Sequence, residues 1–119
     1  MLRMNPNLPP EDGLPPQEVR ITELKATPWP EDGRRVRVSL EMTPFLERPN
    51  LEITIQNSEG REVSSINIIE SIDARMTFTM HLRGDEIKGS YTLTARVHYP
   101  EMGMVDEKDF AFETSAAQE

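Results

Sequence analysis

The chain of 119 residues contains no cysteine, which excludes disulfides, thiolate catalysis and cysteine-ligated zinc. Cations are also scarce: 13 Lys and Arg face 21 Asp and Glu, for a formal net charge of 13 − 21 = −8. Because an acidic surface repels a phosphate backbone, we expect no nucleic-acid partner. No apolar run approaches the roughly 18 residues of a membrane-spanning helix, so we expect no membrane insertion. With no secretory-signal pattern at the start, the sequence favours a soluble, cytoplasmic protein.

Proline divides the chain into an arm and a domain. Half of the ten prolines lie within residues 1–16, and proline both removes backbone donors and disfavours helix before it. We therefore expect residues 1–16 to form a Pro-rich, mostly disordered arm. Residues 17–114 are predicted to form one β-sandwich domain, and residues 115–119 a frayed tail.

Apolar and polar residues alternate along seven runs of this domain, and helical periodicity is nearly absent. Each run buries one face, and with no amphipathic helix to cover these faces the cover must be a second sheet. The sequence thus predicts an all-β, seven-stranded antiparallel two-sheet β-sandwich, with a closed barrel as the alternative. The predicted core comprises Val38, Leu40, Ile53, Ile55, Phe78, Met80, Leu93 and Val97.

The segment from Thr43 to Pro49 carries two prolines and cannot be a ladder strand. Its length suits a crossing from one sheet to the other. We expect Phe45 or Leu46 to close the end of the core there.

The run Gly89-Ser90-Tyr91-Thr92-Leu93 resembles the start of the sixth strand in immunoglobulin-like and fibronectin type III-like sandwiches. The resemblance covers residues 17–114 and implies a tyrosine corner, with the Tyr91 hydroxyl donating to backbone near residues 84–86. This sequence lacks the cysteine pair and has no tryptophan in its third strand, since Trp29 precedes the second. Such sandwiches host many functions, so the resemblance implies a fold and no functional residues.

Only two histidines, His81 and His98, could act as a classical base. Both are out of phase with the apolar residues of their strands, on strands expected in opposite sheets, so they should lie on opposite outer faces. They cannot share a metal ion or a proton there. The run from His98 to Met104 has ligand types that suit copper, but capping of the sandwich end explains it better. The sequence contains no catalytic motif, and we expect no enzyme activity, no metal and no cofactor.

Asp106, Glu107 and Asp109 could donate oxygens to calcium. Their spacing lacks the alternating acidic ladder and the glycine of a calcium loop. A solvated acidic turn is the preferred interpretation.

Isoleucines crowd the fourth predicted strand, at Ile66, Ile68 and Ile69. If Ile66 and Ile68 face the core, Ile69 faces outward, and this strand normally lies at a sheet edge that can template a partner strand. The alternative is a bulge that turns every isoleucine inward.

Arginine supplies ten of the 13 cations. In the sandwich order that the resemblance implies, the first, second and fifth strands are sheet neighbours, so their outward residues should share one basic face, which suits an acidic partner. Its members are Arg20, Arg35, Arg37, Arg75, His81 and Arg83. The alternative is simple cross-strand pairing with Glu18 and Glu41.

The sequence therefore favours a non-catalytic interaction module that binds a protein partner through a sheet edge or face. We expect a monomer or a weak homodimer. The alternative function is a sandwich that binds carbohydrate or another small ligand, for which Trp29, in a Pro-Trp-Pro loop, is the one plausible stacking platform.

Overall fold

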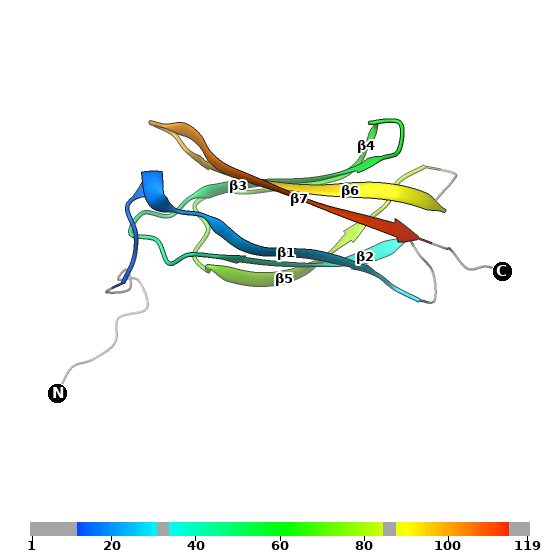
Figure 1. Cartoon of the computed structure of the whole chain (residues 1–119), viewed down its shortest axis with the longest axis horizontal. Helices are drawn as coiled ribbons and strands as arrows, with labels where there is room; N and C mark the ends of the chain where they lie inside the picture. The colour runs from blue at the N-terminus through cyan, green and yellow to red at the C-terminus, as the bar shows by residue number, and fades with distance from the viewer. Residues whose placement is uncertain (1–11, 31–33, 85–87, 115–119) are drawn as a thin grey trace.

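The computed structural model describes residues 12–30, 34–84 and 88–114, and in these ranges the chain is all-β (Figure 1). Both sheets are antiparallel, so the predicted fold class is confirmed. The elements are the short 3-10 helix η1 (Pro16–Glu18) and the strands β1 (Ile21–Pro28), β2 (Arg35–Met42), β3 (Asn50–Asn57), β4 (Glu62–Ile68), β5 (Arg75–His81), β6 (Gly89–Tyr99) and β7 (Gly103–Thr114).

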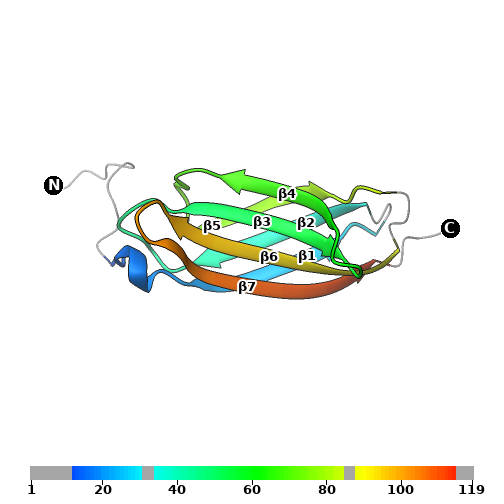
Figure 2. The same cartoon turned by 90° about the horizontal axis from the view of Figure 1, so that it is seen from above.

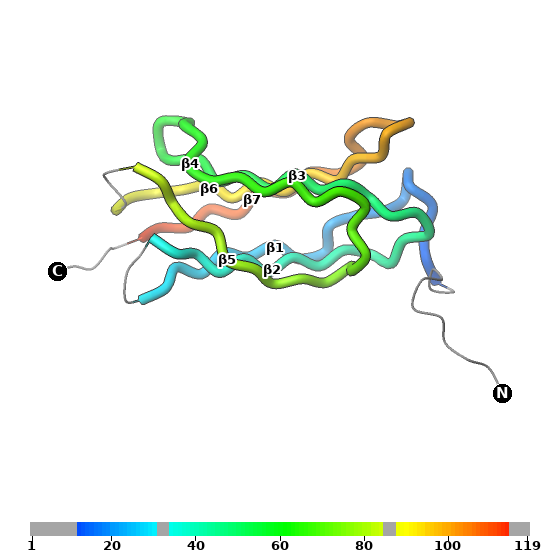
Figure 3. Tube along the Cα trace, turned by 180° about the vertical axis from the view of Figure 1, so that it is seen from behind, coloured from blue at the N-terminus to red at the C-terminus, as the bar shows by residue number. Residues whose placement is uncertain are grey.

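The strands form two layers, with the order β1-β2-β5 in one sheet and β4-β3-β6-β7 in the other (Figure 2). In the described ranges no strand pairing joins the two sheets, so the fold is a sandwich and not a closed barrel. Strand β1 lies against β7 at one side, and β4 and β5 lie together at the other (Figure 3). The predicted adjacency of the first, second and fifth strands is confirmed.

The core fills the space between the sheets with the inward residues of every strand. Seven of the eight predicted core residues are buried, among them Val38, Ile53 and Leu93. Phe78 is only half-buried, because β5 is the edge strand of its sheet and one flank of the ring lacks a neighbouring strand. The alternating pattern therefore identified the core, but overestimated burial at an edge.

The segment between β2 and β3 crosses from one sheet to the other, as its prolines indicate. Phe45 is buried in the core cluster and Leu46 is 46% exposed, so Phe45 is the residue that closes this end.

The arm is more ordered near its end than the sequence suggests. The Leu14 N–H donates to the Pro44 oxygen at 3.0 Å, and the Leu46 N–H donates to the Leu14 oxygen at 3.0 Å. Leu14 also packs against the core, and η1 follows directly. Within the predicted arm, Leu14 and Pro16 are therefore ordered, and for Leu14 partial burial and two backbone hydrogen bonds explain why. The mostly disordered arm over residues 1–16 otherwise stays a prediction. Residues 1–11 and the predicted tail at 115–119 lie outside the described part.

This docking leads to a stability prediction. A chain that begins at residue 17 loses the Leu14 contacts that a chain beginning at residue 12 keeps. We expect the shorter chain to melt about 4–8 °C lower, because ~1 kcal/mol shifts a domain of this size by that amount. Calorimetry of the two truncated chains measures the difference. Melting temperatures within about 2 °C of each other would contradict a stabilising role for Leu14.

Candidate functional site

The predicted basic face is only partly assembled. Arg35 lies directly across from His81 in the β2–β5 register, and Arg37 lies between Thr27 of β1 and Thr79 of β5. Cross-strand neighbours share one face of a sheet, so these residues form a continuous polar patch on the outer face of the three-stranded sheet. Arg35, Arg37 and His81 thus come together as predicted.

Of the other three predicted arginines, Arg75 shares the outward phase of His81 on β5, whereas Arg20 and Arg83 lie outside the strands. Arg75 is at the far end of β5, where it pairs with Glu41 at 3.0 Å, as the cross-strand alternative anticipated. Arg20 precedes β1, and its guanidinium donates to the backbone oxygens of residues 17 and 19 at 3.0 and 2.7 Å. Arg83 follows β5, and its N–H donates to the Val63 oxygen at 3.0 Å. Four of the six predicted residues therefore lie at outward positions of the three-stranded sheet, Arg20 and Arg83 flank the strands, and binding by this face stays a prediction.

Trp29 borders the assembled patch. The Arg35 guanidinium carbon lies 3.9 Å from the centroid of the indole ring, which is the geometry of a cation–π contact. A cavity of about 350 Å³ adjoins the ring and is also lined by Thr27 and Arg37. The Trp29 Nε1 atom is buried without a hydrogen-bond partner among the described residues. One face of the ring is thus already occupied by the protein's own arginine.

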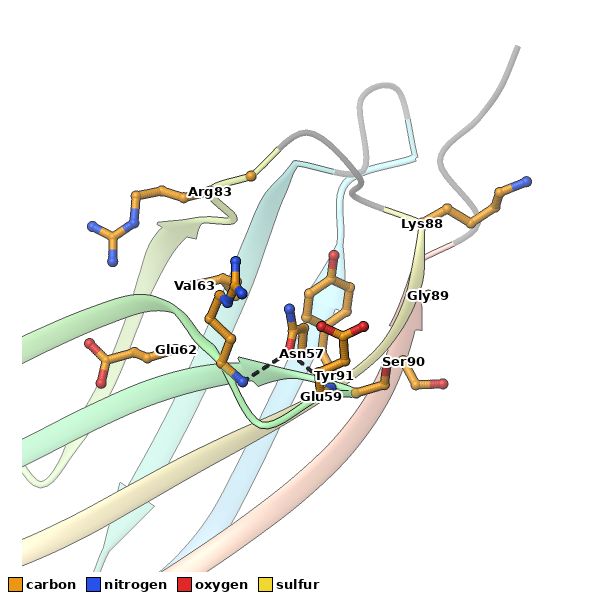
Figure 4. A pocket seen from close by; sticks show the side chains of 12 residues that line it. Asn57, Glu59, Glu62, Val63, Arg83, Lys88, Gly89, Ser90 and Tyr91 are labelled. Carbon is orange, nitrogen blue, oxygen red and sulfur yellow. Dashed lines mark hydrogen bonds between the residues drawn. The ribbon is translucent and has the colours of Figure 1, made fainter.

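A larger cavity of about 570 Å³ lies among the loops that join β3 to β4 and β5 to β6 (Figure 4). We call it the loop cavity. Asn57 organises the β3–β4 turn, because its Oδ1 accepts the N–H groups of Glu59 and Arg61 at 3.0 and 2.9 Å. Figure 4 shows Arg83 and Lys88 extending away from Tyr91 on either side. The lining mixes both charge signs.

Tyr91 forms the floor of the loop cavity and stacks on Phe112, with ring centroids 5.5 Å apart. It lies in β6, the strand that the tyrosine-corner resemblance assigned to it. The predicted hydroxyl partner was placed at residues 84–86, and residues 85–86 lie outside the described part. The tyrosine corner therefore stays a prediction.

Strand β4 lies at the edge of the four-stranded sheet, as predicted. Ile66 and Ile68 pair with inward residues of β3 and are half-buried against the core. Ile69 is 72% exposed, so the outward orientation is right and no bulge turns it inward. At the start of this edge the Val63 oxygen accepts the Arg83 backbone N–H. Among the described residues, this leaves 65–68 as the part of the edge with no second strand beside it.

The turn after β4 holds Ile69 in place. Glu70 adopts φ of +52°, a left-handed conformation that costs energy in a non-glycine residue. Two hydrogen bonds secure it: the Glu70 N–H donates to Asn50 Oδ1, and the Ser71 N–H donates to the Pro49 oxygen, each at 2.8 Å. The exposed isoleucine is therefore fixed by the backbone around it.

Exposed apolar side chains gather at one end of the sandwich. The links β2–β3, β4–β5 and β6–β7 all lie at the end where η1 lies (Figure 1). Each large hydrophobic side chain that is exposed in the described ranges belongs to one of these links or to the first residues of β7. They are Leu46 (46%), Ile69 (72%), Ile72 (66%), Met102 (49%) and Met104 (50%), and we call this set the apolar end. Clustered exposed apolar residues mark interaction surfaces, whereas scattered ones do not.

A cavity of about 690 Å³ opens at the apolar end, which we call the end cavity. Ile69 and Met102 line it, together with residues of η1 and the start of β3. The charged lining residues are Glu47, Arg48, Glu70 and Glu101. Sequence reasoning missed this cavity because four segments far apart in the chain form it.

Tyr99 anchors the wall of the end cavity. Its hydroxyl donates to the Glu47 backbone oxygen at 2.8 Å. Burial, with a smaller contribution from the Glu47 charge, raises the pKa of Tyr99 from 10.0 to about 12. The folded protein therefore favours the neutral phenol.

This shift predicts a loss of stability in alkali. Between pH 10 and pH 12 the unfolded chain ionises Tyr99 and the folded chain does not, so the free energy of unfolding falls as the pH rises. Below pH 10 this contribution is fully present. We expect the free energy of unfolding, measured with urea, to fall more steeply across this window for the wild type than for Tyr99→Phe. Parallel slopes for the two proteins would contradict the shift.

The acidic residues of β7 have separate partners. Asp106 Oδ2 accepts the Ile21 N–H at 2.7 Å, and Asp109 accepts the Thr94 hydroxyl at 2.9 Å. Glu107 accepts from Arg96 Nε at 2.7 Å. The predicted solvated turn is wrong, because these residues belong to a paired strand. Within the described ranges, no three His, Asp or Glu side chains are grouped to hold a metal ion.

The two histidines lie on opposite outer faces, as predicted. His81 is exposed on β5 of the three-stranded sheet. His98 lies on β6 of the other sheet, with its Nε2 at 3.6 Å from a Glu52 carboxylate oxygen. Neither can cooperate with the other in proton transfer or metal binding.

No helix in the described part is long and apolar enough to cross a membrane.

Comparisons with known proteins extend the fold assignment. No family model matches the chain, and no curated protein is significantly similar in sequence. Among solved structures, a Bifidobacterium dentium β-glucuronidase complexed with coumarin-3-O-glucuronide matches with a TM-score of 0.62 and 14% identity, over 81% of this chain and 17% of that one. A glycosyl hydrolase family 2 member from Bacteroides cellulosilyticus matches with a TM-score of 0.61 and 11% identity, over 81% of this chain and 15% of that one. A Ruminococcus gnavus β-glucuronidase in complex with D-glucaro 1,5-lactone matches with a TM-score of 0.53 and 14% identity, over 82% of this chain and 16% of that one.

At these identities the similarity concerns the fold alone. The chain spans only 15–17% of the length of these enzymes, so it matches a fragment of each. A two-sheet β-sandwich of this shape therefore occurs within larger glycoside hydrolase chains.

Proposed function

We propose that this protein is a non-catalytic interaction module that holds a partner protein at the apolar end and the adjoining β4 edge. The clustering of all five exposed large apolar side chains of the described part at one end supports this proposal most strongly. Single exposed leucines are common on protein surfaces. A cluster of apolar side chains beside an open strand edge keeps apolar area in contact with water, which is unfavourable until a partner covers it.

The edge adds directional contacts to this surface. Residues 65–68 of β4 have one strand neighbour, β3, so their outward backbone groups are available to an added strand. Half-buried Ile66 and Ile68 would gain burial from the same strand. A partner peptide can thus combine main-chain hydrogen bonds with apolar contacts, which is the usual form of recognition by strand addition.

We further infer an immunoglobulin-like or fibronectin type III-like sandwich. The order β1-β2-β5 and the position of Tyr91 in β6 support it. One feature departs from the constant-type immunoglobulin order: β4 pairs with β3, whereas that order places the fourth strand beside the fifth.

The similarity to fragments of larger enzymes and the separation of the two histidines are consistent with a non-catalytic role. The cytoplasmic location stays a prediction.

Site-specific photocrosslinking tests the interaction surface. A photoreactive residue at position 69 should form an adduct with a partner protein in cells that make this chain. The control at Ser58, exposed in the β3–β4 turn at the opposite end, should form none. The adduct partner is then purified and titrated with the wild type and with Ile69→Asp/Ile72→Asp.

We expect the double variant to bind the purified partner at least about tenfold more weakly, since two exposed apolar contacts are replaced by charges. Its melting temperature should match the wild type, because both side chains are mostly exposed. Equal affinity of the two proteins, or the same adduct from Ser58, would reject the proposal. An adduct made only of two copies of this chain would show self-association instead.

The Trp29 patch supports a second candidate, a carbohydrate-associated sandwich. Trp29 and Arg37 line an open cavity, and the solved structures of similar fold include enzymes bound to glucuronic acid and related ligands. Aromatic rings and arginine forks suit sugars that carry a carboxylate. The Arg35 guanidinium over one ring face leaves less room for stacking, which is why we rank this function second.

Tryptophan fluorescence separates the two candidates, because Trp29 is the only tryptophan. Under the carbohydrate proposal, a glucuronide should change the emission saturably, and Arg37→Ala should weaken the effect. If emission does not change with any sugar of an acidic and neutral panel, this candidate is rejected and the interaction module is unaffected.

A further inference from the structure

We propose that the end cavity receives a partner segment that carries apolar and cationic side chains together. This inference rests on the proposed function and specifies the chemistry of the partner. The cavity has a volume of about 690 Å³, large enough for several side chains of a peptide. It lies beside the β4 edge, since Ile69 lines the cavity and is also the residue that directly follows β4.

The apolar part of the recognition comes from Ile69 and Met102. They are 72% and 49% exposed, and they enter the cavity from different links, β4–β5 and β6–β7. The Ile69 turn is fixed by the bonds of Glu70 and Ser71 described above. The Met102 turn is closed by its own N–H, which donates to the Tyr99 oxygen at 3.1 Å. A pre-organised wall reduces the entropy that binding must remove.

The charge of the lining selects the sign of the partner. Glu47, Glu70 and Glu101 are exposed around the cavity, and among the described lining residues they face one cation, Arg48. The whole chain adds to this bias, with its formal net charge of −8. An acidic segment would be repelled, whereas lysine or arginine in the segment would be attracted and guided to the site.

The same charges disfavour a symmetric dimer through this end. A two-fold interface places the same patch of both copies face to face. The three carboxylates of one copy would then meet those of the other in a partly desolvated contact, which costs free energy. A partner with basic side chains is therefore a better occupant than a second copy.

The test uses the full chain and three fluorescently labelled peptides of equal length. The first alternates Leu and Lys, the second alternates Leu and Glu, and the third alternates Ser and Lys. Fluorescence anisotropy should show binding of the Leu/Lys peptide at least about tenfold tighter than of the other two. Added salt should weaken that binding, because the carboxylates are exposed to solvent.

Two matched pairs of substitutions locate the effect. Glu70→Gln/Glu101→Gln should weaken binding of the Leu/Lys peptide about two- to tenfold, as expected for two exposed charge contacts. Glu59→Gln/Glu62→Gln changes the net charge equally but lies at the loop cavity, so it should leave affinity unchanged. Ile69→Ser should weaken binding without reducing its salt dependence.

Three results would overturn the inference. They are equal binding of the Leu/Glu peptide, an equal effect of the two Glu pairs, or self-association of the chain that excludes the peptides. If one of these occurs while the position-69 adduct still forms and its purified partner still needs Ile69 and Ile72, the proposed function stands and only the partner chemistry is wrong. Without that adduct, the proposed function itself fails.

Discussion

Truncation of Leu93 to alanine should destabilise the fold by ~2–5 kcal/mol, the usual range for a large buried aliphatic residue. Leu93 is fully buried in β6 and lies across from Ile55 and Phe110 in the two adjacent strands. The substitution removes apolar contacts and leaves a cavity that strands on both sides prevent from collapsing. Urea unfolding measures the loss, which represents much of the stability of a domain of this size.

The matched control is Leu46→Ala, the same change at a residue that is 46% exposed. It should change stability by no more than about 0.5 kcal/mol. Phe78→Ala should fall between the two, since the ring is half-buried at the β5 edge. A Leu93→Ala cost no larger than that of Leu46→Ala would contradict the assignment of the core.

Asp106→Ala should also destabilise the fold, by ~1–3 kcal/mol, because it leaves a buried N–H without an acceptor. Asp106 Oδ2 accepts the Ile21 N–H at 2.7 Å, and Ile21 is buried at the first position of β1. This bond links β7 in one sheet to β1 in the other. Its loss should loosen the side on which these two strands meet, and hydrogen exchange at Ile21 should report that loosening directly.

Asp109→Ala provides the comparison, since Asp109 belongs to the same strand and accepts the Thr94 hydroxyl within its own sheet. We expect a smaller effect on stability and no change in exchange at Ile21. Asp106→Asn should be intermediate, because an amide oxygen still accepts a hydrogen bond but without the charge. If both alanine variants unfold alike, Asp106 has no special role in joining the sheets.

The fold was predictable because a strict period of two repeats seven times without a helical cover. Pleating fixes the direction of every side chain within a strand, so the same period identified most of the core and the outward phase that Ile69 continues after β4. The placing of β1, β2 and β5 in one sheet came from the sandwich resemblance and not from the period.

The errors arose where that geometry ends. Arg20 and Arg83 lie just outside β1 and β5, so strand phase no longer determines their direction. Leu14 stands alone among prolines, and a single apolar residue has no period to reveal that it docks. The end cavity requires η1 and three links to meet in space. No local pattern encodes such a meeting, because it depends on how the two sheets are stacked.

The direction of the first and last strands has a mechanical consequence. The described chain begins beside the apolar end, and β7 runs to the opposite end of the sandwich (Figure 1). A load applied between these two points would pull β1 and β7 apart along their length. Eleven residue pairs join β7 to β6, and a lengthwise load strains them together, whereas peeling would break them one after another. If this module connects other segments, it should act as a stiff spacer that resists extension.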